Sequence, residues 1–221
     1  MESLNILAPV EIRILGALAE KELTTPDYYP LTLNALKMAC NQKSARNPVM
    51  ELDEKVILRS LDSLIQQELV SRFSRQEYRV PKYRHQLKES LGITDDFLAL
   101  LAILLLRGPQ TGGELRTRTQ RMFRFTDVNE VLEKLDRLAQ RRPFPLVVAL
   151  PRIPGQKEIR YSHLFAGMPD VTNETAVAEP IRVDLTADET RLSKLEETVT
   201  ALQTELADLR RELTDFRSEF E

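Results

Sequence analysis

Apolar residues recur at helical spacing in three segments of the first 70 residues. Each segment is preceded by a residue that favours the start of a helix, so helices are predicted from Pro9, from Thr32 and from about Asp53 to Glu68. A polar turn separates two β-prone stretches, residues 69–73 and 78–83. Three helices followed by a hairpin are therefore predicted, with Pro81 confining the second strand to a sheet edge.

The same pattern occurs a second time. The sequence LDSLIQ at residues 61–66 reappears as LDRLAQ at residues 135–140. Each copy is followed by a hairpin that ends in a similar triplet, Tyr-Arg-His at 83–85 and Tyr-Ser-His at 161–163. Two copies are too few for a solenoid, so we interpret them as tandem homologous domains of similar size.

The second copy has clearer helix boundaries. A strongly apolar helix from Thr94 or Asp95 is predicted to stop at the sequence Arg-Gly-Pro, residues 107–109. Thr111 and Glu114 have capping-box spacing, and a third helix is predicted from Thr126 or Asp127 into a hairpin. The predicted fold is mainly α with small β-hairpins (α+β), as two tandem winged helix-turn-helix domains.

A third apolar pattern lies near the C-terminus and has alternating spacings of three and four residues. This is an a/d heptad repeat, which predicts a coiled-coil helix and a homodimer. The charges at the flanking positions fit parallel and antiparallel pairing equally, and a helix folded back on its own chain is the alternative. The predicted pairing positions are Leu192, Leu195, Val199, Leu202, Leu206, Leu209, Leu213, Phe216 and Phe220.

These patterns divide the chain into four parts. The predicted parts are winged-helix domain 1 (1–90), winged-helix domain 2 (91–168), a linker (169–187) and a heptad helix (188–221). The formal net charge of −3 averages over unlike segments: residues 1–90 carry +1, residues 91–168 carry +4, and residues 169–221 carry −8. An acidic tail therefore follows a mildly basic body.

Several sequence strings in the body are distinctive. They are EKE (20–22), TTPDYYPL (24–31), ACNQK (39–43), RNPV (46–49) and LRGPQTGGELR (106–116). In these strings the chain resembles the YceH-like bacterial proteins, a family of unknown function, over roughly residues 7 to 165. The resemblance implies two winged-helix domains, in agreement with the repeat, and implies no catalytic or binding residues.

The composition disfavours catalysis and metal binding. One cysteine and two histidines are too few for a zinc finger, an iron–sulfur cluster or a disulfide framework. His85 and His163 occupy matching hairpin ends with no carboxylate cluster beside them at ligand spacing, which favours packed histidines over a metal site. Cys40 lies on an apolar helix stripe, which indicates a buried, inert thiol. We expect no enzyme, no cofactor and no metal. The sequence shows no secretory signal and no apolar run of membrane-spanning length, which predicts a cytoplasmic protein.

The basic residues suggest a nucleic-acid partner. A winged helix usually places its third helix in the DNA major groove, but both predicted third helices have net charge −2 and are poor at neutralising phosphates. Basic residues concentrate instead on the second helices, the turns after them and the wings. Together with the third-helix residues that point away from the core, the predicted DNA contacts are Lys37, Lys43, Arg46, Lys55, Arg59, Gln66, Arg75, Arg79, Arg116, Arg118, Arg121 and Arg124.

Two functions fit these features. The first is a dimeric protein, such as a regulator of transcription, that binds double-stranded DNA mainly through phosphate contacts. The second is a protein–protein interaction module of tandem winged helices without direct nucleic-acid binding, which the acidic third helices favour. The polar run at residues 41–47 is equally consistent with a partner contact and with a structural turn.

Overall fold

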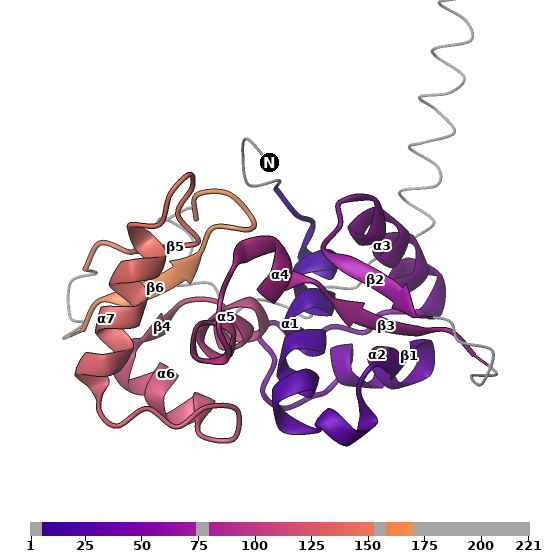
Figure 1. Cartoon of the computed structure of the whole chain (residues 1–221), viewed down its shortest axis with the longest axis horizontal. Helices are drawn as coiled ribbons and strands as arrows, with labels where there is room; N and C mark the ends of the chain where they lie inside the picture. The colour runs from indigo at the N-terminus through magenta and orange to yellow at the C-terminus, as the bar shows by residue number, and fades with distance from the viewer. Residues whose placement is uncertain (1–5, 74–79, 153–157, 170–221) are drawn as a thin grey trace, which may run out of the picture. The chain divides into compact units, whose positions relative to one another are not determined.

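The computed structural model describes residues 6–73, 80–152 and 158–169 of the 221-residue chain. Within these residues the fold is α+β, with seven α-helices and two three-stranded antiparallel sheets (Figure 1). None of the helices in this part of the chain is long and apolar enough to cross a lipid bilayer.

The first half begins with helix α1 (Pro9–Thr24) and a short 3₁₀ turn, η1 (Pro26–Tyr28). Strand β1 (Leu31–Thr32) leads into α2 (Leu33–Cys40), where the Thr32 hydroxyl accepts a hydrogen bond from the Ala35 N–H and caps the helix. Asp53 caps α3 in the same way. The remaining elements are α3 (Glu54–Gln66), β2 (Val70–Phe73), β3 (Lys82–His85) and α4 (Leu87–Leu91).

The second half repeats this order of elements. Its first helix is α5 (Asp95–Arg107), followed by β4 (Gln110–Thr111) and α6 (Gly112–Thr119). Thr111 and Glu114 form the predicted capping box, and Asp127 caps the next helix. The last elements are α7 (Val128–Ala139), β5 (Val147–Ala149) and β6 (Arg160–His163), and the predicted division at residue 90 falls inside α4.

Both sheets have the same strand arrangement. The orders are β1-β3-β2 and β4-β6-β5, so the last strand of each half is the central one. The prediction that Pro81 places its strand at a sheet edge is therefore wrong. Strand β3 begins at Lys82, immediately after the proline, and the missing N–H of Pro81 lies outside the ladder.

Helices α1 and α5 pack against each other and join the two halves (Figure 1). Both are buried around most of their circumference, as expected of a helix in the middle of a core. A methyl group at Gly16 would lie 2.9 Å from Leu106 Cγ, so the glycine permits the close approach. Two backbone hydrogen bonds join the halves as well, from Leu7 N to Phe165 O and from Asn47 N to Leu106 O.

Candidate nucleic-acid interface

The basic residues of the second half lie on α6 and on the turn that follows it. The capping box fixes the start of α6, which puts Arg116 and Arg118 in the last turn, where cations are favoured by the helix dipole. The side chains of Arg116, Arg121 and Arg124 are exposed, and Arg118 is partly exposed. All four predicted contacts of this half are thus accessible from solvent.

The partners of these arginines differ. Arg118 lies 3.3 Å from Glu114, whose other carboxylate oxygen lies 3.3 Å from Arg160. Arg116 donates to the Thr126 carbonyl at 2.8 Å, which orients the guanidinium without neutralising it. Among the described residues, Arg116, Arg121 and Arg124 have no ion-pair partner.

Positive charge continues from α6 to the end of α5. The pKa of Arg107 is lowered, first by burial and then by the neighbouring cations Arg118 and Arg46. Arg107 and Arg118 therefore belong to one positive region, which Glu20 and Glu114 offset only in part. Such a region at the end of a helix attracts a polyanion.

The corresponding residues of the first half are placed differently. Lys37 is partly exposed in the last turn of α2, and Lys43 is exposed in the turn beyond it. Arg46, however, is buried. Its Nη2 atom lies 2.6 Å from the Glu20 carboxylate and its Nε atom donates to the Ala39 carbonyl. Arg46 cannot reach a phosphate in this arrangement, so its assignment as a DNA contact is corrected to a structural role.

The polar run at residues 41–47 is largely structural as well. The Asn41 side chain exchanges two hydrogen bonds with the backbone of Leu52, and Asn47 donates to the Leu106 carbonyl at the end of α5. Arg13, buried beneath the run, donates to the Cys40 and Pro48 carbonyls. Burial, followed by the nearby charge of Arg46, lowers the pKa of Arg13 to about 10. Buried side chains thus hold the turn between α2 and α3.

The third helix of the first half presents mixed charge. Lys55, Arg59 and Gln66 are all exposed on α3, as predicted. They extend over about 17 Å of helix at 1.5 Å per residue, and the carboxylates of Glu54 and Asp62 lie on the same helix. The structure therefore brings these three residues to the surface without making the helix basic.

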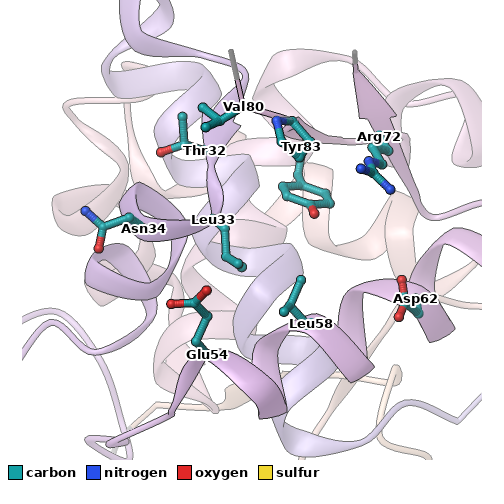
Figure 2. A pocket seen from close by; sticks show the side chains of 10 residues that line it. Thr32, Leu33, Asn34, Glu54, Leu58, Asp62, Arg72, Val80 and Tyr83 are labelled. Carbon is teal, nitrogen blue, oxygen red and sulfur yellow. The ribbon is translucent and has the colours of Figure 1, made fainter. Parts of the chain in front are cut away.

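A groove of about 600 Å³, which no pattern in the sequence predicts, lies between α2, α3 and strands β2 and β3. In Figure 2 the side chains of Leu33, Leu58 and Tyr83 converge on this space, with the Glu54 carboxylate at one end and Asp62 and Arg72 at the other. The signal available in the sequence was Leu58, an apolar residue outside the buried stripe of Ile57, Leu61 and Leu64.

The remaining predicted contacts cannot be placed. Arg75 and Arg79 lie outside the described residues, and so do all nine heptad positions from Leu192 to Phe220.

The two histidines and the cysteine occupy separate sites. His85 is buried beside Glu22 at 3.0 Å, and His163 packs edge-on against Phe165. Cys40 is buried, and burial raises the pKa of its thiol to about 12, which keeps it protonated. In the part of the chain that the structure describes, no group of three or more potential ligands is arranged to hold a metal ion.

Comparison with known proteins gives a consistent family match. Residues 7–156 match the family model described as "Protein of unknown function, DUF480". A UPF0502 protein of Geotalea uraniireducens is 52% identical over 217 residues, which are 97% of this chain and 98% of that protein. A UPF0502 protein of Geobacter sulfurreducens is 50% identical over 218 residues (98% and 99%), and one of Opitutus terrae is 46% identical over 202 residues (91% and 85%). These matches agree with the resemblance to the YceH-like proteins.

Proposed function

Because the chain belongs to the bacterial family described as a protein of unknown function, DUF480, we propose its function from its own geometry: it is a DNA-binding protein. In this proposal two winged-helix domains contact the phosphates of duplex DNA and a C-terminal coiled coil pairs two chains. Regulation of transcription is the role that such a protein would most simply serve.

The assignment of winged helices is supported by the order of elements in each half. A helix, a two-residue strand, two further helices and an antiparallel pair of strands follow one another twice, and in both halves the first strand joins the sheet beside the last. In winged-helix proteins the second and third helices and the hairpin share the face that meets nucleic acid.

The observation that carries the proposal is the set of exposed arginines at α6. Arg116, Arg121 and Arg124 reach solvent without a carboxylate partner among the described residues, and Arg107 and Arg118 add positive charge at the end of α5 and in the last turn of α6. Neutralising DNA phosphates releases condensed counterions, which supplies most of the affinity of sequence-independent binding. Contacts from this region would position the protein on the duplex and read few bases.

Pairing through the heptad positions would double this surface. When the winged-helix domains of one chain have bound a duplex, the linker sets the effective concentration of those of the second chain near the same duplex. The pair therefore binds more tightly than one chain alone. The orientation of the two heptad helices stays open, because the flanking charges fit both arrangements.

The direct test measures fluorescence anisotropy of a labelled duplex across a salt series. If about six phosphates are neutralised, the plot of log affinity against log salt has a slope near −5. Arg121→Glu combined with Arg124→Glu is expected to flatten that slope by about two and to weaken binding at every salt concentration.

The matched control changes net charge by the same amount on another surface. Lys21 lies in the last turn of α1 and Arg142 is exposed after α7, outside the second and third helices and the wings, so Lys21→Glu combined with Arg142→Glu tests the effect of charge alone. Equal losses of duplex affinity in the two double variants would show that the α6 region contributes no more to binding than another basic surface does. A wild-type slope near zero would reject DNA binding altogether.

The second candidate function is protein recognition without nucleic acid. The acidic residues of α3 and α7 favour it, since each of these helices carries a net negative charge over its predicted span. If the wild-type chain does not bind duplex DNA at low salt, protein recognition becomes the favoured function.

A further inference from the structure

The groove between α2, α3 and strands β2 and β3 differs chemically from the basic region at α6. Its apolar residues include Leu33, Leu58 and Val80, and Val80 is 52% exposed. Glu54 and Asp62 add two carboxylates and Arg72 one cation, so the lining is net negative. A surface of this kind repels phosphate and attracts a cation attached to apolar groups.

We propose that this groove binds an extended peptide segment of another protein, with alternating apolar side chains and a basic residue placed against Glu54. The site lies in the first repeat, apart from the α6 arginines that carry the DNA-binding proposal, and it does not depend on DNA binding.

The spacing of the lining residues sets the length of the segment. Glu54, Leu58 and Asp62 are four residues apart on α3, so they share one face of the helix, and the outer two are about 12 Å apart along its axis. An extended chain advances about 3.3 Å per residue, so roughly four residues bridge this distance. The groove volume of about 600 Å³ is in the range of pockets that enclose such a ligand.

The charges of the lining determine the composition of the segment. Among the described residues Glu54 and Asp62 have no ion-pair partner, but Asp62 lines the groove together with Arg72, which offsets its charge. Glu54, exposed in the first turn of α3, is therefore the groove carboxylate that is available to pair with a cation of the ligand. Exposed apolar surface beside it accounts for the alternating apolar residues, because successive side chains of an extended peptide point to opposite sides.

The second half of the molecule shows what opens the groove in the first. Leu33 and Gly112 both follow the capping threonine and begin α2 and α6. A methyl group at Gly112 would lie only 3.0 Å from Leu132 Cδ2 and 3.3 Å from Val128 Cγ1. With no side chain at that position, α6 packs directly on α7. The bulkier Leu33 instead lines the open space between α2 and α3.

The test uses the full-length chain with methyl-labelled leucine and valine, observed by nuclear magnetic resonance. The probe is the peptide acetyl-Arg-Thr-Leu-Thr-Val-amide, and the comparison peptide carries Glu in place of Arg. The Arg peptide is expected to shift the methyl signals of Leu33, Leu58 and Val80 saturably, and the Glu peptide to bind about fivefold more weakly.

Charge exchange tests the contact with Glu54. Glu54→Lys is expected to weaken the Arg peptide about fivefold and to strengthen the Glu peptide by a similar factor, a reversal that a structural defect would not produce. Asp136→Lys is the matched control, because Asp136 is exposed on α7 and occupies the position in the second repeat that Asp62 occupies in the first.

Three results would overturn the proposal. The first is the absence of saturable shifts at the groove methyls, and the second is equal binding of the two peptides. The third is that Asp136→Lys reduces the preference for the Arg peptide as much as Glu54→Lys does. Duplex DNA that shifts the same methyls and displaces the peptide would assign the groove to nucleic acid instead. The failure of DNA binding at α6 would leave all of these peptide measurements unchanged, so the two proposals fail separately.

Discussion

The Nε2 atom of His85 lies 3.0 Å from a carboxylate oxygen of Glu22. His85 Nδ1 accepts a hydrogen bond from the Leu87 N–H at 3.1 Å, so the proton of a neutral ring sits on Nε2 and faces the carboxylate. Lys88 lies 2.5 Å from the other oxygen of Glu22 and 3.1 Å from Asp95. Glu22 on α1 thereby contacts β3 and α4, and Lys88 of α4 in turn contacts Asp95 at the start of α5.

This arrangement makes the stability of the fold depend on pH in the acid range. Burial alone would raise the pKa of Glu22, but hydrogen bonds from His85 and Lys88 outweigh it and lower the pKa from 4.5 to about 2. A carboxylate with a lowered folded-state pKa stabilises the fold above its unfolded-state pKa, and that contribution is lost as the pH falls from about 4.5 to 2. After allowance for partial exposure, the contribution is on the order of 2 kcal/mol.

The check is urea unfolding of wild type and Glu22→Gln across this pH range. The variant is expected to be less stable at neutral pH and to lose less stability on acidification. Glu89→Gln, an exposed carboxylate on α4, serves as the control. If Glu22→Gln and wild type lose stability in parallel, the network does not contribute as described.

His163 makes the stability of the fold depend on pH in a higher range. Burial lowers the pKa of this histidine from 6.5 to about 4, so its folded-state ring is neutral in that interval. As the pH falls from 6.5 to 4 the unfolded chain gains a proton that the folded chain does not, which destabilises the fold by up to about 3 kcal/mol. His163→Phe is expected to remove this loss. Unfolding curves at pH 7 and pH 5 measure it, and an unchanged difference between the two pH values in the variant would contradict the assignment.

Most of the fold follows from local signals in the sequence. The capping residues Thr32, Asp53, Thr111 and Asp127 begin helices where predicted, because a side-chain oxygen satisfies N–H groups that the first helical turn leaves unpaired. Strands β1 and β4 were not predicted. Two residues are too short to show an alternating pattern, and both strands depend on pairing with a partner some 50 residues away.

The candidate site was less predictable than the fold. The sequence identified the exposed arginines of α6 and of the turn after it, because Arg116, Arg121 and Arg124 lie beside few acidic residues. It could not identify the burial of Arg46, since its partner Glu20 is distant in sequence and becomes adjacent only when α1 packs against the loop. The groove depends on the spacing of α2 from α3, which is a tertiary property.

The close packing of α1 on α5 predicts sensitivity at Gly16. A methyl group there would lie 2.9 Å from Leu106 Cγ and 3.0 Å from Leu105 Cβ, closer than carbon atoms can approach without displacement. Gly16→Ala is expected to destabilise the fold by about 1–3 kcal/mol, although alanine favours helix formation. Urea unfolding measures this change. In the background of Leu106→Ala, which removes the Leu106 contact and leaves Leu105 Cβ, the same substitution should cost less stability than in the wild type, and additivity of the two changes would argue against a steric cause.

Substitution of Arg46 is expected to reduce the stability of the fold, whereas substitution of Arg124 is expected to reduce duplex binding. Arg46→Met leaves the partly buried Glu20 carboxylate and the Ala39 carbonyl without their partner, which costs about 2–4 kcal/mol. The salt dependence of duplex binding should keep its slope in this variant, measured where the chain is still folded. Arg124→Met should leave stability nearly unchanged and reduce the slope by about one. The reverse pattern would return Arg46 to the DNA interface.

The proposed pairing of two chains predicts a mass and an affinity that change together. Leu202 and Leu209 are d positions of the heptad repeat, so Leu202→Asp combined with Leu209→Asp places charges in the proposed seam and should convert a dimer into a monomer of 25.4 kDa. Light scattering after size exclusion gives the mass, and duplex binding should weaken because the second body is no longer linked. Thr204→Asp combined with Ala207→Asp adds the same charge away from the seam and should leave the dimer intact. A monomeric wild-type chain would favour the helix folded back on its own body, whereas a dimer that survives the Leu202 and Leu209 changes would place the pairing surface elsewhere.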